Sequence, residues 1–195
     1  MTADRSILEG FFVNSKLLLP HQAVEIAAHF QEKMISKNEL HLCAGSICNE
    51  YMFLEKGYMR AYTNDTAGKE VTTLFYTPGE VVFEVSSFFN RYVSKENIQA
   101  TTDCRIWSIT YDQLNMLFHG MPEFREFGRG LLVKGFVNLK QRMLSMVADT
   151  AEERYLQLLR TQPEILLNNS LKNVASYLGV SDTTLSRIRK DYSHR

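Results

Sequence analysis

Short apolar runs alternate with turn-forming residues across residues 36–109. The runs are rich in aromatic and β-branched side chains and include YMFL at 51–54, YMRAY at 58–62, VTTLFY at 71–76 and IWSI at 106–109. Glycine, proline and asparagine stand between the runs. This pattern predicts an antiparallel β-sandwich or barrel. Ahead of it, the apolar spacing over residues 22–34 predicts a short amphipathic helix.

A helical period replaces the strand pattern from Tyr111 onward. It predicts a short helix over residues 111–118 and a long helix that begins near Pro122 and reaches about Val147. Within the long helix, five apolar residues are spaced 4, 3, 4 and 3 apart and form a heptad-type seam: Leu132, Phe136, Leu139, Met143 and Met146. Such a seam must be covered, either by the chain's own β-domain or by the same helix of a second copy. Glycines at 128, 130 and 135 weaken an isolated helix, or mark the close approach of another backbone.

A new helix is predicted to start at Thr150, since Thr150 and Glu153 have the spacing of a capping box. We therefore divide the chain into a β-domain over residues 1–119, a long helix over 120–148 and a C-terminal helical domain over 149–195.

Residues 171–190 carry the pattern of a helix-turn-helix, LKNVASYLGVSDTTLSRIRK. Apolar residues mark one face of a first helix, and Gly179 follows where a helix end needs a left-handed residue. Val180 is predicted to be a buried plug in the turn, and Ser181 can cap the second helix, whose inward residues are Leu185 and Ile188.

The second helix is predicted to present its polar residues outward, as a DNA-reading helix does. The candidate DNA-binding residues are Ser181, Asp182, Thr183, Thr184, Ser186, Arg187, Arg189 and Lys190. Residues 171–195 hold five basic side chains, Arg195 among them, against two acidic ones. The alternative interpretation is a helical hairpin whose charged face is simply solvated.

Composition limits the classes of function that remain. The chain is 45% hydrophobic and 23% charged, which excludes a disordered or collagen-like protein. Its formal net charge is zero, so a nucleic-acid contact has to come from a local basic patch. The N-terminus has no signal-peptide pattern and no apolar run is long enough to span a membrane. We therefore expect a cytoplasmic protein without a membrane partner.

Candidate catalytic and metal-binding groups are sparse. Cys43, Cys48 and Cys104 are too few for an iron–sulfur cluster with four thiolates and lack zinc-knuckle spacing, although redox sensing stays open. Five histidines, at 21, 29, 41, 119 and 194, are dispersed along the chain. No metal or other cofactor is identified, a single axial haem ligand would leave no motif, and no phosphate loop or nucleophile elbow predicts an enzyme.

The two halves of the chain together resemble the Crp/Fnr-type transcription regulators, and most closely their short Bacteroidetes-like members. In the C-terminal half the resemblance rests on AEERY at 151–155, VASYLGVS at 174–181 and TLSRIR at 184–189. In the N-terminal half it rests on FLEKG at 53–57, GKE at 68–70, PGE at 78–80 and NIQA at 97–100, which resemble a cyclic-nucleotide-binding β-roll. The match runs from about residue 20 to residue 192.

This resemblance implies an α+β fold: an N-terminal antiparallel β-roll, jelly-roll-like (a double-stranded β-helix), with flanking helices, a long central dimerisation helix and a C-terminal helix-turn-helix. It also implies a homodimer that binds double-stranded DNA, with two recognition helices in successive major grooves. RNA polymerase is a further partner that the resemblance implies. The base-reading positions fall on Asp182, Thr183 and Arg187, while the β-hairpin wing of longer members is expected to be missing.

The resemblance also locates a candidate effector pocket, at Phe83, Glu84, Val85, Ser94 and Lys95. Glu84 falls on the position that binds the ribose hydroxyl, but Phe83 replaces the glycine before it. Ser94 and Lys95 replace the Arg-Ser pair that holds the cyclic phosphate. Without a bidentate arginine and a glycine that admits the ligand, cyclic AMP or GMP is not expected as the effector. A different effector, or none, stays open.

Two hypotheses of different classes follow. The first is a dimeric, sequence-specific DNA-binding transcription regulator of the Crp/Fnr type. The second is a β-roll that binds a ligand or a partner protein and whose helical tail serves only in protein association.

Overall fold

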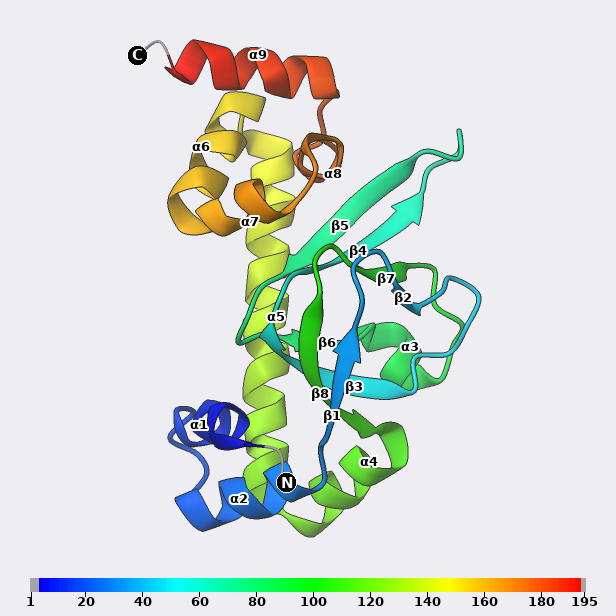
Figure 1. The fold of residues 1–195 in the computed structure, drawn as a ribbon, viewed down its shortest axis with the longest axis vertical. Helices are drawn as coiled ribbons and strands as arrows, with labels where there is room; N and C mark the ends of the chain where they lie inside the picture. The colour runs from blue at the N-terminus through cyan, green and yellow to red at the C-terminus, as the bar shows by residue number, and fades with distance from the viewer. Residues whose placement is uncertain (1–3, 194–195) are drawn as a thin grey trace.

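The computed structural model describes residues 4–193, and its elements are arranged along one long helix (Figure 1). The helices are α1 Ser6–Val13, α2 Pro20–Ala28, α3 Val85–Asn90, α4 Tyr111–Gly120, α5 Pro122–Ala148, α6 Ala151–Thr161, α7 Pro163–Asn168, α8 Leu171–Tyr177 and α9 Asp182–Ser193. The strands are β1 Gln31–Ile35, β2 Leu40–Leu42, β3 Glu50–Lys56, β4 Met59–Asn64, β5 Glu70–Tyr76, β6 Val81–Val82, β7 Asn97–Ala100 and β8 Cys104–Thr110. Helices α1, α2 and α4 surround the lower end of α5, and α6–α9 its upper end.

Two four-stranded antiparallel sheets form the β-roll. The first sheet has the strand order β1-β8-β3-β6 and the second the order β2-β7-β4-β5. The antiparallel β-roll with flanking helices, the long helix and the C-terminal helices are therefore confirmed as the fold class.

Strand β3 is buried on both of its faces, which explains its unbroken apolar run. Tyr51, Met52, Phe53 and Leu54 are all buried. The Phe53 ring lies 4.7 Å from the ring of Phe11 in α1, measured between centroids. The first sheet therefore packs against the second sheet on one face and against helices on the other.

Aromatic side chains attach the start of α5 to the roll. Phe12 of α1 and Phe124 and Phe127 of α5 are buried, and the Phe12 and Phe127 rings are 5.4 Å apart. Phe118 of α4 stacks on Phe124 at 5.1 Å. Gly128 makes this packing possible, because a Cβ atom there would lie 2.7 Å from the Phe118 ring. This glycine thus marks a close approach within the chain.

Beyond this aromatic cluster, α5 leaves the roll and its apolar seam is uncovered. Phe136 and Leu139 are 68% and 64% exposed, and Leu132, Met143 and Met146 are exposed as well. The alternative that the seam packs on the chain's own β-domain is therefore wrong. The methyl group of Met146 does touch the chain, beside Gly179 of the helix-turn-helix.

The predicted helix over residues 22–34 is wrong in its second half. Helix α2 ends at Ala28, and β1 then pairs with β8 from Gln31↔Ser108 to Ile35↔Cys104. Residues Gln31–Ile35 form a strand because they pair with β8, far along the chain. Local apolar spacing carries no information about that partner.

We expect Phe124→Ala to lower the free energy of unfolding by about 3–5 kcal/mol, because it removes a fully buried ring at the junction of α1, α4 and α5. Urea denaturation measures the change. Met116→Ala, on the exposed side of α4, is the control and should change stability little. Equal losses in the two variants would contradict the role given to the aromatic cluster.

Candidate nucleic-acid interface and sensor pocket

Helices α8 and α9 form a helix-turn-helix whose turn depends on Gly179. Ser170 caps α8, since its Oγ accepts a hydrogen bond from the Asn173 amide at 3.2 Å. Gly179 has φ +69°, and the Val180 amide donates to the Ala175 carbonyl at 3.0 Å, which closes the end of α8. Val180 is half-buried, not the fully buried plug that the sequence predicts.

The start of α9 is held by hydroxyl groups. Ser181 Oγ accepts from the Thr184 amide at 3.2 Å and lies 2.8 Å and 2.9 Å from the hydroxyls of Thr183 and Thr184. These contacts fix the first turn, whose amides carry the positive end of the helix dipole.

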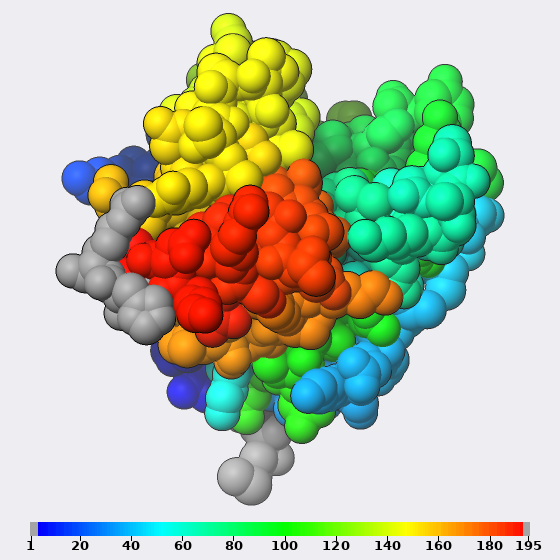
Figure 2. Space-filling view, turned by 90° about the horizontal axis from the view of Figure 1, so that it is seen from above, coloured from blue at the N-terminus to red at the C-terminus, as the bar shows by residue number. Residues whose placement is uncertain are grey.

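Helix α9 lies across one end of the molecule, where it faces the viewer in red in Figure 2. The candidate residues Ser181, Asp182, Thr183, Ser186, Arg187, Arg189 and Lys190 are exposed, and Thr184 is half-buried. Leu185 is buried beneath them. Arg195 and His194 lie outside the described residues.

Arg189 differs from the other candidates in its surroundings. It lines a cavity of about 60 Å³ together with Leu166, Asn169, Leu171, Val174 and Leu185. Arg189 follows Leu185 by four positions, so it stands on the side of α9 that is turned toward α7 and α8. Asp182, Thr183 and Arg187 are not among the residues that line this cavity.

Two arginines that the sequence analysis missed attach α8 to the helices before it. Arg142 of α5 donates to the Tyr177 carbonyl at 2.8 Å, and its guanidinium lies 3.6 Å from the centre of the Tyr177 ring. Burial lowers the pKa of Arg142, and its contacts with Tyr177 oppose that shift. Arg154 of α6 donates to the carbonyls of Leu178, at 3.0 Å, and Asp149, at 2.6 Å. Nothing in the local motif identifies either residue, since both act on backbone carbonyls.

The candidate effector residues do not converge on one cavity. Glu84 caps α3, with its carboxylate accepting from the amides of Ser86 at 3.1 Å and Ser87 at 2.6 Å. The Phe83 ring packs against Tyr51 and Phe88, at centroid distances of 5.0 Å and 5.5 Å.

The remaining candidates around α3 are dispersed. Ser94 is buried and donates to the Glu96 carbonyl at 2.7 Å, while Lys95 and Val85 are exposed. Arg91 donates to the Cys48 carbonyl at 3.0 Å, and its guanidinium lies 4.1 Å from the Tyr111 ring. The guanidinium of Arg91, the arginine nearest to Ser94 and Lys95 in the sequence, is therefore engaged by the protein itself.

Metal-binding and redox groups are isolated in the part of the chain that the structure describes. Residues 4–193 contain no group of three His, Cys, Asp or Glu side chains placed to hold a metal ion. Cys43 is exposed, whereas burial raises the pKa of the Cys48 and Cys104 thiols. Within the same residues, no helix has the length and apolarity that crossing a bilayer requires.

Known proteins are similar to this chain over its N-terminal β-roll and its C-terminal helices. Residues 32–120 match the family model described as cyclic nucleotide-binding domain. The anaerobic regulatory protein of Haemophilus influenzae is 24% identical over 170 residues, which cover 81% of this chain and 65% of the relative. The transcriptional activator protein anr of Pseudomonas aeruginosa is 24% identical over 79% of this chain and 67% of its own length.

Solved structures share the fold of both the β-roll and the C-terminal helices. FixK2 from Bradyrhizobium japonicum superposes with a TM-score of 0.76 at 17% identity, over 85% of each chain. A chain from Eubacterium rectale assigned to the crp/fnr family superposes with a TM-score of 0.73 at 15% identity, over 94% of this chain and 88% of the other. The fold of this protein is that of the Crp/Fnr-type regulators. The chain spans about 65% of the length of the Haemophilus relative.

The resemblance to Crp/Fnr-type regulators can be compared with the contacts observed around α3. Glu84 stands at the ribose position of the resemblance, but its carboxylate is occupied by two backbone amides of α3. A ribose hydroxyl would have to compete with this cap. The pocket residues of the Crp/Fnr-type resemblance stay a prediction.

Gly179→Ala is expected to destabilise the helix-turn-helix by about 1–2 kcal/mol, because alanine disfavours the left-handed φ of +69°. The tip of Met146 lies 2.7 Å from the new Cβ position and has to move as well. Thermal unfolding measures the loss. Gly10→Ala in α1 is the matched control, with open space around the new Cβ, and should stabilise the protein slightly. A neutral Gly179→Ala would show that the turn does not require glycine.

Proposed function

We propose that this chain is a sequence-specific DNA-binding transcription regulator of the Crp/Fnr type that acts as a homodimer. The observation that carries the proposal is the exposed polar face of α9 at the end of a molecule whose long helix leaves an apolar seam bare. The relatives named as regulatory proteins and as a transcriptional activator support the same function. By the family resemblance, RNA polymerase is a partner and the cytoplasm is the compartment.

The α5 seam supports dimerisation. A stripe of large apolar side chains exposed over several turns costs free energy in water and is stable when a second copy covers it. Parallel pairing of two α5 helices would place both α9 helices at the same end of the dimer. Two recognition helices about 34 Å apart then enter successive major grooves on one side of the duplex.

The three base-reading candidates have complementary chemistry. Arg187 carries a guanidinium whose paired donors match the O6 and N7 acceptors of guanine. Asp182 can accept from the amino group of cytosine, and the Thr183 methyl and hydroxyl suit a thymine or a phosphate. All three are exposed on the first two turns of α9.

We further propose that any effector of the β-roll is not a cyclic nucleotide held through Glu84. The carboxylate that would bind the ribose hydroxyl caps α3, and Phe83, which stands where the family has a glycine, packs its ring against Tyr51. The exposed Lys95 offers a single ammonium group where a bidentate fork is needed.

Arg187→Ala is expected to weaken binding to a duplex selected by the wild-type protein by about 10- to 100-fold and to relax the base preference at one position. Fluorescence anisotropy at physiological salt, with an unrelated duplex for comparison, measures both effects. Lys134→Ala removes the same charge from the side of α5 opposite the seam and is the control. Unchanged affinity in Arg187→Ala would overturn the assignment of α9 as the reading helix and favour a role in protein association.

Leu139→Glu should convert the dimer to monomers, because it places a carboxylate in the middle of the seam. Sedimentation velocity reports the change. Gln141→Glu introduces the same side chain on the opposite side of α5, two positions away, and should stay dimeric. If Leu139→Glu also sediments as a dimer, the seam is not the interface.

A further inference from the structure

The covalent link between the sensor and the helix-turn-helix unit is short and carries no helix. Helix α5 ends at Ala148 and α6 starts at Ala151. Asp149 and Thr150 between them have extended backbones, with φ,ψ of −93°,149° and −69°,162°. Two extended residues allow α6–α9 to swing as a unit. The orientation of α9 therefore depends on non-covalent contacts.

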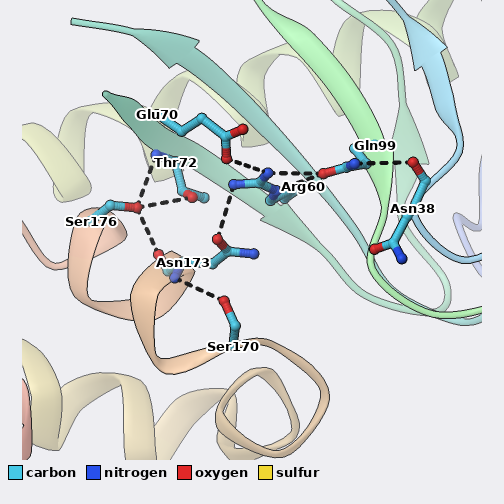
Figure 3. Close-up of polar contacts among 8 residues, drawn as sticks. All are labelled: Asn38, Arg60, Glu70, Thr72, Gln99, Ser170, Asn173 and Ser176. Carbon is cyan, nitrogen blue, oxygen red and sulfur yellow. Dashed lines mark hydrogen bonds and ion pairs between the residues drawn. The ribbon is translucent and has the colours of Figure 1, made fainter. Parts of the chain in front are cut away.

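The outer face of the second β-sheet supplies such contacts, and α8 covers it (Figure 3). Arg60 of β4 pairs in register with Gln99 of β7 on one side and with Phe75 of β5 on the other. Directly opposite residues of an antiparallel pair point to the same face, so these three side chains lie side by side beneath α8.

Arg60 is bonded to three different elements at once. Its guanidinium donates to Gln99 Oε1 at 2.8 Å, to Glu70 Oε2 at 2.7 Å and to Asn173 Oδ1 of α8 at 3.1 Å. The residue is only 5% exposed. In turn, the Gln99 amide donates to the Asn38 carbonyl at 3.0 Å, which extends the network across the sheet.

A second polar contact lies one turn further along α8. The Thr72 amide of β5 donates to Ser176 Oγ at 3.1 Å, and Ser176 Oγ lies 3.0 Å from the Thr72 hydroxyl. Beside it, the Phe75 and Tyr177 rings are 5.0 Å apart. Phe75 is 4% exposed and belongs to the hydrophobic core of the helix-turn-helix unit, although it comes from the β-roll.

We propose that these two contacts, Arg60–Asn173 and Thr72–Ser176, form a latch that sets the orientation of the recognition helix relative to the sensor. Hydrogen bonds are directional, and a buried guanidinium that loses a partner keeps its desolvation cost. A rotation of α8 away from β4 and β5 would cost the Arg60 guanidinium one of its three acceptors and leave the Thr72 amide without Ser176. The apolar contact of Phe75 tolerates small rotations, whereas the polar pair does not. Arg60 is thus a positioning residue for α9.

One consequence of the latch, its effect on DNA binding, rests on the proposed function. In a dimer, two α9 helices held at one angle accept one spacing between half-sites. A swinging helix-turn-helix unit still reads a half-site through Arg187, but tolerates several spacings and loses affinity for the best one, because binding then has to fix the orientation. A loss of base preference would therefore indicate a defect in reading by α9, whereas a loss of spacing preference would indicate a defect in its positioning.

The test uses the double variant Asn173→Ala/Ser176→Ala in the full chain. Both substitutions remove the polar groups of α8 and raise its helix propensity, so α8 itself should fold. Thr63→Ala is the matched control, since Thr63 lies on the same strand as Arg60 but donates to the Lys95 carbonyl instead of α8. Asn173→Asp is the conservative variant, because a carboxylate can accept the same hydrogen bond from Arg60.

The first readout is hydrogen exchange without DNA, followed over β5 and over residues 148–154. We expect exchange in both segments to rise about 10-fold or more in the double variant, and to stay at the wild-type rate in Thr63→Ala and Asn173→Asp. Unchanged exchange in the double variant would overturn the latch, whether or not the protein binds DNA.

The second readout is binding to duplexes selected by the wild-type protein, with the half-site spacing lengthened or shortened by one or two base pairs. The latch predicts that the double variant discriminates among spacings about 10-fold less than the wild type, while the preferred bases stay the same. A loss of base preference with intact spacing preference would contradict a positioning role. If the wild-type chain selects no sequence, the proposed function fails, and the exchange measurement still decides the latch.

Discussion

The packing of Phe124 and Phe127 against the aromatic side chains of α1 and α4 is the interaction on which the rest of the molecule depends. It attaches the first turns of α5 to the β-roll and thereby aims the remainder of that helix away from the sensor. The helix can then expose one apolar seam along its length and carry the helix-turn-helix unit at its far end. Without this anchor, neither the seam nor α9 would have a defined position relative to the sensor.

Helix α8 serves two structures at the same time. Its buried residues Val174 and Ala175 form the core beneath α9, while Asn173 and Ser176 bond to the outer face of the second sheet. Arg142 and Arg154 hold its end from α5 and α6 through backbone carbonyls. A change of angle at α8 therefore breaks contacts to three separate parts of the molecule, so the proposed latch would couple the β-roll to α9 at this helix.

The residues around α3, where the family resemblance places a ligand site, are bonded within the protein. Glu84 accepts two amides as the cap of α3, Phe83 joins an aromatic cluster, and Arg91 bonds to carbonyls of the loop before β3 and of α3. Each of these groups is satisfied by the protein itself. Ligands that recognise this region would have to displace such contacts or bind elsewhere on the roll.

The sequence by itself determined the elements whose cause is local. The capping box at Thr150 and Glu153, the helix start at Pro122 and the glycine turn at Gly179 depend on neighbours a few residues away, and all three are found where the sequence places them. The spacing of apolar residues also predicted the α5 seam, because a helical period depends only on residues within the same helix. Tertiary structure alone decided the strand at Gln31–Ile35, which exists through its ladder to β8. It also decided the roles of Arg60 and Phe75, whose partners in α8 lie about a hundred residues further along the chain. A buried arginine in a strand has no periodic or motif signature, since what defines its role is the set of acceptors that folding brings around it.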